Sequence, residues 1–245
     1  MLVLLPPSET KLDGGDGPPL RLDALAHPEL NHLRDELVDE LVRLSADVPA
    51  ARAALGVSDR QDGEIARNAA LRTSPTAPAL HRYTGVLYDA LDVRSLRGIA
   101  AARAEARLAV GSALFGLVQA ADLVPAYRLS AGSSLPGRGT LAATWKPVLE
   151  PVLAGIAARE LVVDLRSGSY AAFARVPGAV TVTVLTAQRT IVSHVNKAHK
   201  GKLARVLAGT RAEPTDAAGV AAVARRAGMH VERRGTALEI VLAEG

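Results

Sequence analysis

Short apolar runs alternate with amphipathic helical patterns along this chain, and this alternation limits its possible folds more than any other feature. Leu2–Leu5 and Leu161–Leu165 are apolar runs of strand length, whereas leucines between Leu30 and Leu44 recur at spacings of three and four residues. The runs predict buried strands and the spacings predict a helix with one apolar stripe. The fold class expected is α/β or α+β, a mixed β-sheet flanked by helices.

The remaining segments fit the same interpretation. Further strands are expected at Arg107–Leu114, Ala179–Leu185, Thr190–Ser193 and, as a hairpin, Met229–Leu242, with a break at Ser74–Pro78. Further helices are expected after the capping box of Ser58 and Gln61, at Leu141–Ala158 despite two prolines, at His194–Ala208 closed by Gly209, and at Thr215–Ala227. At 245 residues, the chain is expected to form a single domain, 1–245, with a helical part at about 20–105 and a basic part at about 106–245.

Charge is distributed very unevenly along the chain. Residues 1–50 hold ten acidic and four basic residues, whereas Leu165–Ala212, here called the acid-free segment, holds eight basic residues and no acid. Such a segment predicts a positively charged cleft that attracts phosphate-bearing partners. The alternative is that these bases are scattered over a solvated surface.

Several classes of protein are excluded by composition. The chain has no cysteine, so it has no disulfide, thiolate metal site or cysteine nucleophile. Its six histidines show no ligand spacing with nearby acids, so no metal and no cofactor is expected, and iron ligation is not expected either. No apolar run is long enough for a membrane helix, and the first residues do not resemble a signal peptide, so we expect a soluble cytoplasmic protein without a membrane partner.

Two loops that follow strands carry the candidate site residues. Ser8-Glu-Thr-Lys11 follows the first strand and Ser167-Gly-Ser-Tyr170 follows Leu161–Leu165. Loops at the carboxyl ends of strands border the ligand crevice of open α/β sheets, and small hydroxyl and glycine residues there can surround an anion. The basic helix adds Lys197, Lys200 and Lys202.

The order of several separated motifs resembles that of the YaaA peroxide-stress protein family over nearly the whole chain. These motifs are Leu4-Leu-Pro-Pro-Ser-Glu-Thr-Lys11, Tyr83-Thr-Gly85, Leu114-Phe-Gly-Leu117, Pro125-Ala-Tyr-Arg-Leu129, Trp145, Val163-Asp-Leu-Arg-Ser167 with Tyr170, and Lys197-Ala-His-Lys-Gly201. The chain departs from the family pattern at Ser130 and Ser169, where the family usually has acids, and at Lys200-Gly201, where it has Arg-Gly.

The resemblance implies a YaaA-type fold with a positively charged cleft, DNA binding and a role in limiting oxidative damage under peroxide stress. It also implies an element like a helix-hairpin-helix, for which Lys197–Leu207 is the nearest candidate. Such elements contact the phosphate backbone rather than the bases. The two missing acids weaken any acid–base role that the resemblance would transfer.

Two functions therefore stay open, beside a third possibility in which the motif residues only maintain the fold. The first is DNA binding without sequence specificity, in the peroxide-stress response, through a basic cleft; the second is an enzyme acting on a phosphorylated or nucleobase-like small molecule in the same cleft. The anion-binding candidates are Ser8, Lys11, Arg128, Lys146, Ser167, Tyr170, Lys197, Lys200 and Lys202. If the protein is an enzyme, Ser8 is the candidate nucleophile and Lys11 or Tyr170 the candidate base. A deep pocket would favour the enzyme, and an open groove would favour DNA.

Overall fold

A mixed seven-stranded sheet forms the centre of the structure, a computed structural model that describes residues 1–242. Its strand order is β5-β4-β1-β7-β8-β10-β9. The strands are β1 (Leu2–Leu5), β4 (Leu108–Ser112), β5 (Gly116–Gln119), β7 (Val162–Asp164), β8 (Val180–Leu185), β9 (Val231–Arg234) and β10 (Ala237–Val241). The four inner pairs are parallel, and the edge strands β5 and β9 pair antiparallel. The mixed α/β class predicted from the sequence is confirmed.

Helices account for most of the remaining described chain. The α-helices are α1 (Asn31–Leu44), α2 (Val48–Leu55), α3 (Asp62–Ala69), α4 (Ala79–Arg82), α5 (Val86–Leu91), α6 (Gly98–Arg107), α7 (Leu141–Ala157), α8 (Gly168–Ala171), α9 (Ser193–Gly209) and α10 (Ala217–Arg226). Short 3-10 helices lie at Leu22–Ala24, Pro28–Leu30, Asp59–Gln61 and Val93–Ser95. The predicted capping box of Ser58 and Gln61 is present, and α7 contains both prolines as predicted.

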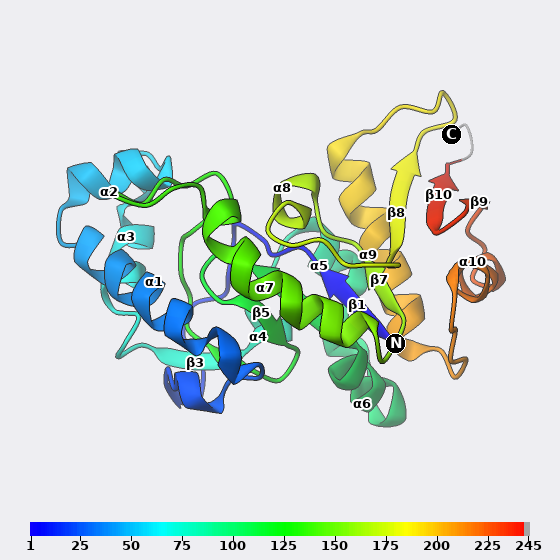
Figure 1. Cartoon of the computed structure of the whole chain (residues 1–245), viewed down its shortest axis with the longest axis horizontal. Coiled ribbons are helices and arrows are strands. Elements are labelled where there is room, and N and C mark those ends of the chain that lie inside the picture. Colours follow the sequence, from blue (N-terminus) through cyan, green and yellow to red (C-terminus); the bar gives the residue numbers. More distant parts are fainter. Residues whose placement is uncertain (243–245) are drawn as a thin grey trace.

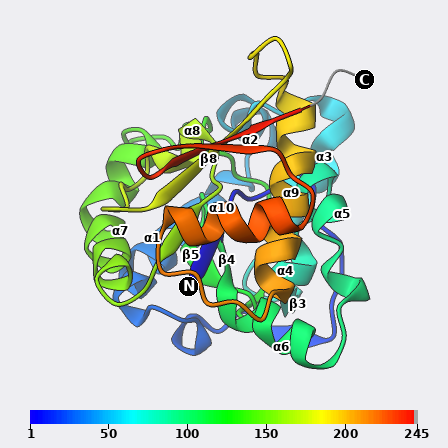
Figure 2. The ribbon, with the colours of Figure 1, turned by 90° about the vertical axis from the view of Figure 1, so that its right-hand side faces the viewer.

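The helices lie at both ends of the molecule and on both sides of the sheet. In Figure 1, α1, α2 and α3 lie at one end of the molecule and α9, α10 and the last strands at the other, with β1 between them. Figure 2 shows α7 on one side of the strands, and α9 with α5 on the other. The buried residues form a hydrophobic core that includes all of β1 and the apolar stripe of α1, because leucines spaced three and four apart lie on one helix face.

A second, three-stranded sheet corrects one sequence-based prediction. The strands β2 (Gly17–Pro19), β3 (Pro75–Pro78) and β6 (Leu123–Val124) pair in the order β2-β3-β6. The predicted break at Ser74–Pro78 was therefore wrong over most of its length. The two prolines of β3 led to the prediction of a break. A proline can nevertheless occupy a short strand where its missing N–H is not needed for pairing.

The basic helix region differs from the sequence prediction in three respects. No strand forms at Thr190–Ser193, since this segment leads directly into α9. Gly209 belongs to α9 itself, and the cap is Thr210 with an extended backbone, so the predicted glycine cap was wrong. Lys197–Leu207 lies within the continuous α9 helix, so the helix-hairpin-helix expected there is absent from this described segment.

The neighbouring strands β1 and β7 place the two predicted loops together. They run parallel, with Leu4 opposite Asp164, so the chain leaves both strands at the same edge of the sheet. Within residues 1–242, no helix combines the length and the apolar character that crossing a membrane requires. The same described residues contain no cluster of three or more His, Asp or Glu suited to hold a metal ion.

Candidate functional site

A cavity of about 510 Å³ lies at the edge where β1 and β7 end. We call it the serine–lysine pocket. It is bordered by the loop after β1, the turn before α5, the loop after β7, and the first two turns of α9. Five residues predicted from the sequence line it: Ser8, Ser167, Tyr170, Lys197 and Lys200. The structure therefore brings the two strand exits and the basic helix together at one cavity.

Helix α9 contributes one polar stripe to this pocket. Ser193, Asn196, Lys197 and Lys200 all line it, and their spacings of three, four and seven residues place them on one helix face. The Oδ1 atom of Asn196 is buried and has no hydrogen-bond partner among residues 1–242. A buried acceptor without a donor is costly, so this atom is available for a donor group on a ligand.

Lys200 fixes the loop after β7 to helix α9. It is 9% exposed, and its ammonium donates to the backbone oxygens of Leu165 at 3.1 Å and Arg166 at 3.3 Å. Burial lowers the pKa of Lys200, while Asp164 raises it. Two of its three N–H groups are thus already used, which makes Lys200 chiefly a positioning residue for the Ser167 loop.

Asp164 and Arg166 stabilise the same loop from inside. The Asp164 carboxylate accepts from the backbone N–H of Arg166 at 3.0 Å and from its guanidinium at 2.7 Å and 2.9 Å. The guanidinium also donates to the carbonyls of Tyr170 and Ala174. Asp164 therefore caps a turn, the structural role expected of an acid within an apolar strand, and does not face the pocket as a free carboxylate.

Hydroxyl groups lie close together where the β1 loop meets the turn before α5. Ser8 Oγ lies 3.3 Å from Thr10 Oγ1, and Thr84 Oγ1 donates to the same Thr10 atom at 2.9 Å. Gly85 has φ +93°, and a Cβ there would lie 3.3 Å from Ser8 Oγ. The positive φ favours glycine at this position, and a Cβ there would be in tight contact with the Ser8 hydroxyl.

Lys11 lies behind the pocket wall rather than in it. Its ammonium donates to the backbone oxygen of Ser8 at 2.9 Å and lies 4.1 Å from the centre of the Tyr127 ring. Burial lowers the pKa of Lys11 to about 7, Glu9 raises it and Arg128 lowers it. The ammonium faces the Ser8 carbonyl and not its hydroxyl, so Lys11 is not placed as a base for Ser8.

Buried tyrosines form the apolar side of the site. Tyr88 and Tyr170 both line the serine–lysine pocket, and the Tyr88 hydroxyl donates to the backbone oxygen of Pro6 at 2.8 Å. Behind them, the Tyr83 and Tyr127 hydroxyls lie 2.9 Å apart, and Ser112 Oγ is 2.7 Å from Tyr127. Burial raises the pKa of Tyr170, which disfavours the phenolate needed for the predicted role as a base.

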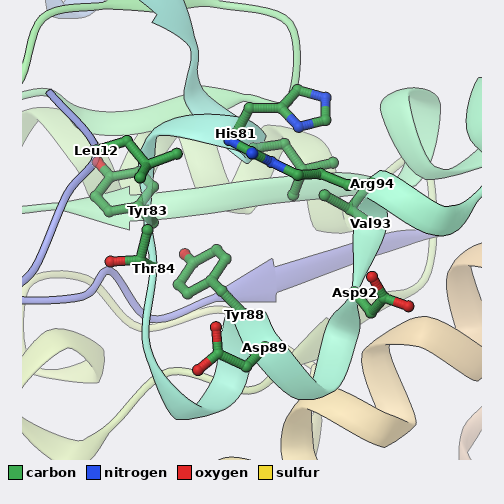
Figure 3. A pocket seen from close by; sticks show the side chains of 10 residues that line it. Leu12, His81, Tyr83, Thr84, Tyr88, Asp89, Asp92, Val93 and Arg94 are labelled. Carbon is green, nitrogen blue, oxygen red and sulfur yellow. The ribbon is translucent and has the colours of Figure 1, made fainter. Parts of the chain in front are cut away.

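A smaller cavity of about 230 Å³ lies on the other side of Tyr88. In Figure 3 the Tyr88 ring lies between Thr84 and Asp92, with His81 and Arg94 at the far side. Thr84 and Tyr88 line both cavities, so they form the wall between them. Burial lowers the pKa of His81, and Arg94 lowers it further.

The other predicted anion-binding residues lie outside the pocket. Arg128 is half-buried beside Glu9, a residue of the pocket rim. Lys146 is exposed on α7 and lines a separate hollow with Glu150 and Arg175. Lys202 is exposed on α9 and does not line the pocket. The structure thus does not bring Lys146 together with the other candidates.

Three of the eight bases of the acid-free segment are paired with acids from elsewhere in the chain. These ion pairs are Arg166 with Asp164, Arg189 with Glu232 and Glu239, and Arg205 with Asp92. Acids of α1 pair instead with Arg72 and Arg138. Lys197 and Lys202 make no ion pair within residues 1–242. Arg175 and Arg211 of the same segment are also exposed and make no ion pair among these residues, so its unpaired bases are not confined to α9.

The sequence analysis missed three kinds of pocket residue. Asn196 and Ser193 could have been found from their helical spacing to Lys197 and Lys200. Tyr88 and Gly85 come from a segment distant in sequence, and only the packing of α5 against α9 brings them here. Glu9 was part of a quoted motif, but its position at the pocket rim gave no sequence signal.

The arrangement is suited to binding an anion that carries an apolar or planar part. Lysine, serine and threonine side chains supply donors, while prolines, leucines and tyrosines form the walls. Ser8 Oγ has only Thr10 Oγ1 as a hydrogen-bond neighbour among residues 1–242, so no base is hydrogen-bonded to it in this structure.

A family model and several related proteins all match this chain over most of its length. A family model described as "Peroxide stress protein YaaA" matches residues 1–228. The chain is 49% identical over 240 residues to UPF0246 protein CE1889 of Corynebacterium efficiens, covering 95% of each chain. It is 45% identical over 239 residues to UPF0246 protein SCO2297 of Streptomyces coelicolor, covering 95% of this chain and 92% of the relative. Together with the ordered motifs and the mixed α/β fold, these matches show that the chain belongs to the YaaA peroxide-stress protein family.

Proposed function

We propose that this protein binds a small phosphorylated or nucleobase-like molecule in the serine–lysine pocket as its part in the peroxide-stress response. The observation that carries the proposal is the convergence of two serine-bearing strand exits and the α9 lysines on one cavity of about 510 Å³. Pockets for small ligands in proteins usually measure about 300–1,000 Å³. The donors suit a phosphate, and the tyrosine and proline walls suit a planar ring.

A thermal-shift titration with inorganic phosphate and nucleoside monophosphates tests this proposal. A ligand that binds only the folded protein raises the melting temperature by roughly 5 °C or more at about a hundredfold excess over its Kd. We expect the shift to persist at high salt, because charges in a partly enclosed pocket are screened less than exposed ones.

The variant Ser167→Asp should abolish that shift. A carboxylate at Ser167 repels an anion in the pocket and cannot donate a hydrogen bond to it. The matched control is Ser58→Asp, which adds the same charge at an exposed N-cap where aspartate caps equally well. Equal shifts in wild type and S167D, or no shift with any phosphate compound, would refute this function for the pocket.

A second candidate function, binding of the DNA backbone without sequence specificity, is favoured by the exposed lysines of α9. Lys197 lies at the pocket rim and Lys202 is exposed on the same helix, and neither makes an ion pair within residues 1–242. Exposed lysines of this kind neutralise phosphates and release counterions. In this role the protein would shield DNA from peroxide-derived damage.

The DNA candidate predicts a defined change in salt dependence. In the double variant Lys197→Gln and Lys202→Gln, the slope of log K against log salt for duplex DNA should fall by about 1.8, because two phosphate contacts are lost. Filter binding at several salt concentrations measures this slope. Lys146→Gln on α7 is the matched control and should leave it unchanged. An unaltered slope in the double variant excludes α9 as the DNA-contacting surface.

A further inference from the structure

Arg128 carries a buried guanidinium edge without a hydrogen-bond acceptor. Its backbone is held on both sides by the Asn68 amide, which accepts from the Arg128 N–H and donates to its carbonyl, each at 2.8 Å. The side chain is 15% exposed, and its Nε has no hydrogen-bond partner among residues 1–242. An arginine N–H can only donate, so a buried Nε of this kind lacks an acceptor.

Glu9 occupies only part of that edge. Its Oε2 lies 3.3 Å from Arg128 Nη2, and the glutamate side chain is 53% exposed. Elsewhere in the chain arginines bind carboxylates through two nitrogens at once, as Arg52 does with Asp62 at 2.7 Å and 2.5 Å. The contact of Glu9 with Arg128 is longer than these bonds and uses only Nη2, although Nε and Nη2 together could bind two oxygens.

Glu9 also connects this edge with the serine–lysine pocket. It lies one residue after Ser8, and both residues line the pocket. Burial is the main cause of the pKa shifts of Lys11 and Tyr170; beyond it, Glu9 raises both pKa values and Arg128 lowers both. Without the Glu9 carboxylate, the Arg128 guanidinium would have no ion-pair partner among residues 1–242.

We propose that Glu9 is a built-in competitor for the anion site: its carboxylate holds the place that a ligand oxyanion takes on Arg128 once Glu9 turns out to solvent. The proposal rests on anion binding in the serine–lysine pocket and adds to it a specific arginine contact and a residue that weakens binding. The ligand class is an oxyanion with two oxygens free to accept from Nε and Nη2, as a phosphate has.

The structure gives physical reasons why Glu9 can move and why the exchange favours the ligand. Glu9 lies in the chain between the end of β1 and Lys11, and its side chain is largely in solvent, so turning it outward breaks one loose ion pair. A phosphate that replaces it can satisfy the buried Nε as well as Nη2. When Glu9 turns outward, its carboxylate also no longer repels a phosphate bound at the pocket rim.

Removing the charge of Glu9 tests the proposal directly. In Glu9→Gln, we expect inorganic phosphate to bind roughly tenfold more tightly than in wild type, measured by isothermal titration calorimetry at constant ionic strength. The gain should disappear in the double variant Glu9→Gln, Arg128→Lys, because a lysine ammonium keeps the charge but cannot offer the paired nitrogens. Glu105→Gln, at an exposed residue of α6 outside both cavities described above, controls for the change in net charge.

Each outcome separates this proposal from the function on which it rests. Equal phosphate affinity in wild type and E9Q overturns the competitor role and leaves anion binding in the pocket intact. An equal gain in E105Q, or a gain that survives Arg128→Lys, also overturns it, because the effect would then be general charge or another cation. No phosphate binding in either wild type or E9Q overturns both the competitor and the pocket function. Thermal melts show whether every variant folds, including the double variant that changes the largely buried Arg128.

Discussion

Replacing Gly201 by alanine is expected to destabilise the protein by about 2 kcal/mol or more. A Cβ at this position would lie 2.2 Å from the carbonyl oxygen of Leu87 and 2.9 Å from the Cβ of Ala90. Helices α9 and α5 are in close contact here, and backbone cannot move aside as a flexible side chain can. The two helices must therefore separate, and the polar stripe of α9 would move away from the pocket.

The matched control is a glycine in a helix that has room for a methyl group. Gly155 lies within α7, and the nearest atom to a Cβ there is a side-chain nitrogen of Arg159 at 3.7 Å. Alanine in a helix interior is favoured over glycine by up to about 1 kcal/mol, so G155A should be stabilising. Urea denaturation of both variants measures the free energy of unfolding. If G201A were as stable as wild type, the close contact of α9 with α5 would be disproved.

The second large effect expected is a pH dependence of stability that comes from Lys11. Burial lowers its pKa from 10.5 to about 7 in the folded protein, whereas an unfolded lysine keeps the ordinary value. Between about pH 7 and pH 10 the unfolded chain therefore binds a proton that the folded chain has released. The free energy of unfolding therefore rises with pH over that window, by up to about 1.4 kcal/mol per pH unit. Below about pH 7, the folded state bears the full cost of burying the charged Lys11 ammonium.

A comparison of two lysine-to-methionine variants isolates this effect. In Lys11→Met the buried amine is replaced by an apolar chain, so the variant should gain stability relative to wild type near pH 7 and lose that advantage towards pH 10. The lost hydrogen bond to Ser8 and the lost contact with Tyr127 reduce the gain at every pH but do not alter its slope. Lys146→Met, at an exposed position, should show no such slope. Parallel stability curves for wild type and K11M between pH 7 and pH 10 would rule out the lowered pKa.

Some features of the pocket can be predicted from local sequence patterns, and others depend on tertiary packing. The apolar runs at Leu2–Leu5 and Leu161–Leu165 predict two strands, and the serines after them are predicted site residues because strand exits border ligand crevices. No local pattern predicts that β1 and β7 are adjacent and parallel, because strand order depends on contacts between distant segments. That pairing brings Ser8 and Ser167 to one cavity.

The differences between the expected and the observed placement of the lysines have the same origin. Lys146 and Lys197 have the same chemistry, yet one lies beside a separate hollow on α7 and the other at the pocket rim. Lys200 was predicted to bind an anion, but in the fold its ammonium already holds the carbonyls of Leu165 and Arg166. A sequence records that a residue is charged and not which groups will face it, because the partner comes from another element.

The sequence by itself determined the long helices, most strands of the seven-stranded sheet, the mixed α/β class, the family and the chemical character of the site, because periodicity, strand-exit residues and ordered motifs are local properties of the chain. Only the tertiary structure decided which bases are paired, which lysines reach the pocket and that Glu9 lies against the buried edge of Arg128. These features depend on the burial and mutual distance of groups far apart in the chain, and electrostatic free energies are set by those two quantities.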